Sequence, residues 1–105
     1  MNITIVGAGS FGSAMAVALA ETKNKIFLWS RRTEAVEKMR QCRENVEYMP
    51  GIQLAENVFP TDDFKTASKK SKVILLCLPA QKTRGFLEIH NKQIVDTPIV
   101  LCAKG

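Results

Sequence analysis

Three glycines near the amino end have the spacing of a phosphate-binding turn. The stretch Gly7-Ala8-Gly9-Ser10-Phe11-Gly12 follows a short β-branched run and opens a stretch rich in alanine, methionine and leucine. Between a strand and a helix, such a pattern gives each glycine a task. Gly7 permits the tight turn, Gly9 lets the backbone approach a diphosphate, and Gly12 lets helix and strand pack closely. The stretch therefore predicts a dinucleotide cradle at a helix N-terminus. A turn selected only for packing is the alternative.

The residues after the second predicted strand indicate which dinucleotide would bind. An NAD site usually has an acidic residue about 20 residues after the glycine turn, where it holds the ribose 2′-hydroxyl. Here residues 25–29 are followed by Ser30-Arg31-Arg32, without a carboxylate. Arginine suits bidentate recognition of phosphate. Arg31 and Arg32 therefore predict a 2′-phosphate and NADP(H) as the preferred cofactor, with NAD(H) as the alternative. Otherwise they are solvated loop charges, or stack on adenine without discriminating.

The elements that must position these residues alternate along the whole chain. Apolar runs predict strands at 2–6, 25–29, 58–59, 72–78 and 98–103. Helical periods or caps predict helices at 10–21, from the N-cap Thr33 onward, from 61–63 to about 70, and at 81–92. Residues 45–57 carry Pro50-Gly51 and no clear period, which predicts a long loop. This order predicts an α/β fold with a doubly wound parallel sheet of the Rossmann type.

The length allows one domain only. A chain of 105 residues suits a single dinucleotide-binding domain spanning 1–105. Its last residues, Lys104-Gly105, come straight after a predicted strand. Because ligands bind beyond the carboxyl ends of such strands, we expect the chain to be a fragment of a longer protein.

Charge and composition restrict the class of partner. The net charge is +5, from 15 Lys and Arg against 10 Asp and Glu. Most of the positive charges are scattered among acids, and the one dense cluster, Lys69, Lys70 and Lys72, is expected at a solvated helix end. The sequence lacks the aromatic residues interleaved with basic ones that proteins binding single-stranded nucleic acid require. These features argue against nucleic acid and favour a phosphorylated small molecule.

The cysteines and the single histidine offer no catalytic or metal site. Cys42, Cys77 and Cys102 lack metal-ligand spacing, and the last two lie in apolar runs, which predicts buried reduced thiols. His90 is predicted to be a surface or boundary residue. The sequence contains neither a signal peptide nor an apolar run of about 18 residues, which predicts a cytoplasmic protein without a membrane span.

Several segments together resemble a known family. They fall at 5–12, 28–31, 45 with 48–52, 78–81 and 103–105. In order and spacing they are similar to the bacterial NAD(P)-dependent glycerol-3-phosphate dehydrogenases. The glycine turn is shared with many dehydrogenases. The Asn…Tyr-x-Pro-Gly stretch and the terminal Lys-Gly are more particular, so the resemblance is fairly specific.

The resemblance implies an activity and a set of binding residues. The family interconverts dihydroxyacetone phosphate and sn-glycerol 3-phosphate, which feeds phospholipid synthesis. By resemblance, Ser10 and Phe11 would contact the cofactor, Arg31 with Arg32 would hold its adenosine phosphate, and Tyr48 would lie near it. Lys104 would reach both cofactor and substrate. A homodimer of the full-length protein stays open.

This chain departs from the family at two positions and in length. Phe11 stands where the family usually has Trp or Tyr, and Ala80 stands where it usually has Ser. The family's proton-transferring lysine and most of its substrate pocket belong to a helical C-terminal domain, which has no counterpart here. The resemblance therefore implies no catalytic residue in this chain. Alone, the chain should bind cofactor weakly at best and catalyse nothing.

Two other functions use the same glycine turn. Ketopantoate reductases and other two-domain reductases share the turn and an arginine after the second strand, but residues 45–52 and Lys104-Gly105 favour the first family. A regulatory nucleotide-sensing module commonly holds NAD through an acidic residue after that strand. The stretch 30–32 argues against such a module.

Overall fold

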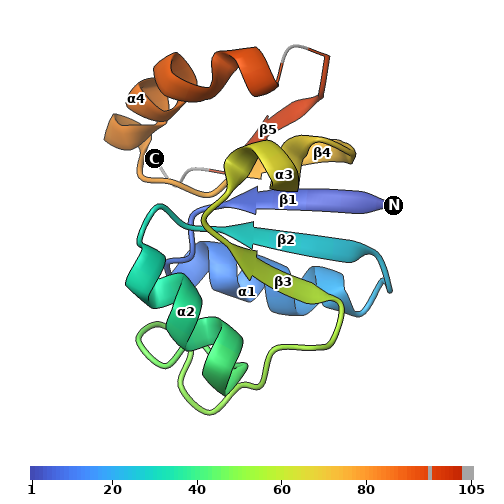
Figure 1. The fold of residues 1–105 in the computed structure, drawn as a ribbon, viewed down its shortest axis with the longest axis vertical. Coiled ribbons are helices and arrows are strands. Elements are labelled where there is room, and N and C mark those ends of the chain that lie inside the picture. Colours follow the sequence, from blue (N-terminus) through green and yellow to red (C-terminus); the bar gives the residue numbers. More distant parts are fainter. Residues whose placement is uncertain (95, 103–105) are drawn as a thin grey trace.

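The structure is a computed structural model that describes residues 1–94 and 96–102. Among these residues, a parallel sheet of five strands is covered by helices on both faces (Figure 1). The strands are β1 (Asn2–Val6), β2 (Lys25–Trp29), β3 (Val58–Thr61), β4 (Ser71–Leu76) and β5 (Ile99–Leu101). The helices are α1 (Ser10–Ala20), α2 (Thr33–Cys42), α3 (Phe64–Ser68) and α4 (Ala80–His90), followed by the 3-10 turn η1 (Asn91–Gln93). The predicted α/β fold is confirmed.

The strand order predicts a binding crevice at the carboxyl ends of the two central strands, β1 and β4. The order is β3-β2-β1-β4-β5, so the chain winds outward from β1 in one direction and then from β4 in the other. Backbone bonds continue beyond the strands at their carboxyl ends: the Gly7 N–H donates to Trp29 O at 2.9 Å, and the Cys77 N–H donates to Val6 O at 2.9 Å. In doubly wound sheets, ligands bind where the winding direction reverses. That point lies between β1 and β4.

Each face of the sheet has its own apolar core, because neighbouring strand residues point to opposite faces. Ile3 and Ile5 of β1 pack on the face covered by α1 and α2, whereas Val6 packs on the face covered by α3 and α4. The second core contains an aromatic cluster in which Trp29 and Phe86 approach with ring centroids 5.3 Å apart. Phe86 and Ile94 are buried in this core, and Leu87 packs against it.

Several helix and strand boundaries in the structure differ from the predicted ones. The prediction of Thr33 as the N-cap of α2 was wrong: Arg32 is the N-cap, and the Thr33 hydroxyl donates instead to the Asp62 carboxylate at 2.9 Å. β3 extends to Thr61, although Pro60 lacks an N–H, because β3 lies at the sheet edge, where a missing donor is tolerated. β4 begins and ends earlier than predicted, at Ser71–Leu76.

The segment 45–57 forms none of the named helices or strands, as predicted, yet it is anchored. Arg43 ends α2 in the left-handed conformation with φ 53°. Its guanidinium donates to Ala55 O at 2.6 Å and to Val58 O at 2.8 Å. These bonds tie the end of α2 to the far end of the loop and to the start of β3.

Candidate functional site

The turn between β1 and α1 has no room for side chains at its two ends. Gly7 has φ +107°, and a Cβ there would lie 2.7 Å from Cys77 O. A Cβ on Gly12 would lie 1.7 Å from Gly7 O. Both distances are far below van der Waals contact. Gly7 is therefore required by the nearby end of β4 and by its positive φ, and Gly12 by the close approach of α1 to the turn.

The middle glycine faces open space at the start of a helix. Gly9 is the N-cap of α1, and a Cβ built on it meets nothing within 4 Å. The first-turn N–H groups of a helix lack partners within the helix. The first turn of α1 contains no acidic residue that would compensate the positive end of its dipole. The geometry thus offers free donors and positive potential to an anion that approaches the bare backbone.

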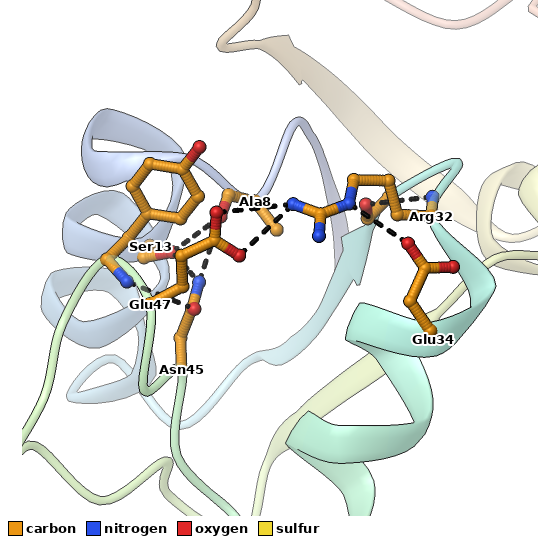
Figure 2. Close-up of polar contacts among 8 residues, drawn as sticks. Ala8, Ser13, Arg32, Glu34, Asn45 and Glu47 are labelled. Carbon is orange, nitrogen blue, oxygen red and sulfur yellow. Dashed lines mark hydrogen bonds and ion pairs between the residues drawn. The ribbon is translucent and has the colours of Figure 1, made fainter.

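A buried amide fastens the 45–57 loop to the glycine turn (Figure 2). Asn45 is 6% exposed, and its Nδ2 donates to Ala8 O at 2.9 Å and to Ser13 Oγ at 2.8 Å. The Ser13 hydroxyl donates in turn to Ala8 O at 3.3 Å. On the loop side, the Tyr48 N–H donates to Asn45 Oδ1 at 3.4 Å. Asn45 therefore sets where Tyr48 lies relative to the turn.

A cleft of about 820 Å³ opens at the carboxyl ends of β1, β2 and β4. Of the sequence-predicted binding residues, those that line it are Gly7, Gly9, Ser10, Phe11, Arg31, Arg32 and Tyr48. Gly12 does not line the cleft; it permits the packing beneath it. Lys104 lies outside the described residues. Phe11 and Tyr48 are 41% and 44% exposed, so they offer flat apolar surface to a ligand.

The two arginines after β2 differ in their partners. The Arg32 guanidinium is 3.2 Å from the Glu34 carboxylate and 3.1 Å from that of Glu47 (Figure 2). The hydrogen bond to Glu34, and then that to Glu47, raises the pKa of Arg32. Arg31 forms no ion pair with a carboxylate of the described residues. Of the two, Arg31 is the one whose charge is free to meet a ligand.

His90 lines the cleft and is partly buried, so it is a boundary residue, as predicted. Its imidazole packs against Phe86 and Phe64, with ring centroids 4.6 Å and 4.8 Å apart. Burial lowers the pKa of His90, which favours the neutral ring.

The cysteine prediction holds for one of two residues. Cys77 is buried, and this burial, followed by the effect of neighbouring Cys102, raises its pKa to about 12, so it stays a thiol. Cys102 is only half-buried, because it follows the edge strand β5, all of whose residues are exposed. The residues that the structure describes contain no His, Cys, Asp or Glu cluster suited to a metal ion.

Several contributors to the site were missed from the sequence. The clamp made by Asn45 and Ser13 was not foreseen, although Asn45 belonged to the resemblance. Glu47 and Lys82 also line the cleft. Both are ordinary exposed charged residues in the sequence, and no local signal marks them.

The family comparison agrees with this geometry. A family model described as NAD-dependent glycerol-3-phosphate dehydrogenase N-terminus matches residues 2–105. The chain belongs to the glycerol-3-phosphate dehydrogenase family. Within it, a protein of Anaplasma marginale named glycerol-3-phosphate dehydrogenase (NAD(P)+) is 35% identical over a match 108 residues long, which covers 100% of this chain and 32% of that protein. The namesake from a Ruegeria species is 37% identical over 105 residues, 100% of this chain and 32% of that protein.

A solved structure of this dehydrogenase family shares the fold closely. The crystal structure of glycerol-3-phosphate dehydrogenase from Coxiella burnetii matches with a TM-score of 0.93 at 30% identity, covering 99% of this chain and 32% of that one. The chain thus spans about a third of the length of the curated relatives it matches. The family predicted from the residues is confirmed. No helix in the described part of the chain has the length and apolar character of a membrane span.

The packing role of Gly12 predicts a loss of stability on substitution. Gly12→Ala should lower the free energy of unfolding by about 2 kcal/mol or more, because its Cβ must displace a backbone oxygen 1.7 Å away. Gly9→Ala is the matched control, since its Cβ enters open space. Chemical denaturation measures both. Equal stability of the two variants would contradict the close approach.

The environment of His90 predicts a pH-dependent stability. Its pKa lies below the ordinary 6.5 in the folded state, so its contribution to stability is present above that pH and is lost as the pH falls. The melting temperature should therefore drop between about pH 7 and pH 5.5, and the drop should shrink in His90→Phe. Thermal denaturation across this range measures it. An identical drop in both proteins would show that another group titrates.

Proposed function

We propose that the cleft binds NADP(H) or NAD(H), and that the gene product carrying residues 1–105 interconverts dihydroxyacetone phosphate and sn-glycerol 3-phosphate. The observation that carries the proposal is the bare backbone at Gly9, which faces open space at a helix start without a carboxylate. A diphosphate needs such a surface. The names of the relatives, which specify NAD(P)+ and glycerol 3-phosphate, support the choice of cofactor and substrate.

The residues of the cleft fit the parts of a dinucleotide. The backbone at Gly9 and Ser10 would hold the pyrophosphate, and Arg31 would meet a 2′-phosphate on the adenosine ribose. Phe11 and Tyr48 would exclude water from the cofactor with their apolar surfaces. When bound, the cofactor supplies or accepts the hydride. The protein's part is to orient it toward the crevice between β1 and β4.

The substrate side of the reaction extends beyond the described residues. We propose that Lys104 binds both cofactor and substrate, and that a helical segment outside residues 1–105 supplies the proton-transferring group. Residues 1–105 alone would then turn over no substrate. The free cysteines fit a reducing, cytoplasmic setting. The glycerol 3-phosphate formed would serve phospholipid synthesis. The full-length protein would form a homodimer, which light scattering tests.

The activity itself is tested with the gene product that carries residues 1–105. It should oxidise NADPH or NADH when dihydroxyacetone phosphate is added, and ketopantoate should give no oxidation; absorbance at the nicotinamide band measures both. Gly9→Val should abolish cofactor binding, because its side chain fills the space that the diphosphate needs. Normal NADPH binding by this variant, with its fold intact, would exclude the glycine turn as the binding site.

The charge of Arg31 predicts a preference between cofactors. Arg31→Glu should weaken NADPH binding by about tenfold or more and move the preference toward NADH, because a charge-assisted bond is replaced by repulsion. Calorimetric titration with each cofactor measures the change. Lys38→Glu, the same reversal at an exposed position outside the cleft, is the control. An unchanged NADPH-to-NADH preference in Arg31→Glu would refute the 2′-phosphate role.

A further inference from the structure

A carboxylate lies next to the residues that follow β2, although it comes from a distant part of the sequence. Residues 30–32 contain no acid, yet Glu47 lies beside them: its Oε2 is 3.1 Å and its Oε1 is 3.4 Å from Arg32 Nη1 (Figure 2). Glu47 comes from the loop after α2 rather than from β2. Among the described residues that line the cleft, it is the one carboxylate.

The position of Glu47 is fixed by its neighbours along the chain. Asn45 is buried and bonded to the glycine turn, and the Tyr48 N–H is bonded to Asn45. The backbone on both sides of Glu47 is therefore tied to the site that would hold the diphosphate. A carboxylate placed in this way stays beside Arg32, next to the carboxyl end of β2.

Glu47 also changes the charge that a ligand meets after β2. Arg32 is held by Glu47 on Nη1 and by Glu34 on Nε. The two arginines and two carboxylates sum to zero formal charge. A dianionic phosphate therefore meets far less positive potential than the sequence Arg31-Arg32 suggests, and it must compete with Glu47 for Arg32.

We propose that Glu47 is a cofactor-selectivity residue, whose carboxylate accepts a hydrogen bond from a free 2′-hydroxyl and opposes a 2′-phosphate. This inference rests on the proposed function of the cleft as the NAD(P)(H) site. Glu47 performs, from a different segment, the task that an acid after the second strand performs in NAD sites. It offsets Arg31, so the protein accepts both cofactors and prefers NADP(H) less than its arginines alone would dictate.

If Glu47 served only as a structural ion pair, its replacement would leave the choice between cofactors unchanged. The side chains of Arg32 and Glu47 are 48% and 53% exposed, and ion pairs at such exposure contribute little to stability. Replacing Glu47 should therefore leave the melting temperature unchanged. Its effect should appear in the choice between cofactors.

The test compares cofactor binding by Glu47→Gln and wild type, using the gene product that carries residues 1–105. Calorimetric titration at low salt should show NADPH binding tightened roughly three- to tenfold, with NADH binding unchanged or weaker. The gain should shrink as salt is added, because these charges are exposed. Glu56→Gln is the matched control: it removes the same charge at an exposed position outside the cleft, and the ratio of the two affinities should stay at the wild-type value.

Each outcome is decisive. A raised NADPH-to-NADH affinity ratio in Glu47→Gln alone supports the role of Glu47. If wild type binds both cofactors and Glu47→Gln keeps the same ratio, Glu47 is only a surface ion pair and the inference is overturned. An equal rise in Glu56→Gln would assign the effect to net charge and overturn it as well. If wild type binds neither cofactor, the proposed function fails and the inference falls with it.

Discussion

The architecture of the site depends on one close approach of the backbone to itself. The Gly7 carbonyl oxygen occupies the space that a Cβ on Gly12 would need, 1.7 Å from its ideal position. Only with two bare positions can the chain leave β1, turn back and begin α1 against the strand end. That contact aims the amino end of α1 at the point where the strand order reverses, which is where a parallel sheet binds its ligands.

Around this turn, polar contacts replace the regular structure that the 45–57 loop lacks. Asn45 satisfies Ala8 O and Ser13 Oγ in a buried place, where an unpaired amide would be costly. Through this clamp the loop brings an aromatic ring and a carboxylate to the cleft. The same segment that completes the apolar wall therefore also sets the charge that a cofactor in this cleft would meet.

The fold could be predicted from local patterns, because β-branched runs and helical periods are short-range signals. The glycine turn was also local, and its position between β1 and α1 is confirmed. Contacts between distant segments could not be predicted in this way. Thr33 was predicted to cap α2, but its hydroxyl donates a hydrogen bond to Asp62 instead. Glu47 reaches Arg32 only because the irregular loop folds back, and no periodicity or cap signals that path.

In the proposed function, the backbone at the start of α1 holds the diphosphate of the cofactor. The most direct measurement is an amide-resolved NMR titration of the protein with NADPH. The largest shifts should fall on the amides of Gly9, Ser10 and Phe11, with smaller ones at Tyr48. If the resonances of those amides do not shift while others at α3 or along β5 do, the nucleotide binds elsewhere and the glycine turn does not hold the diphosphate.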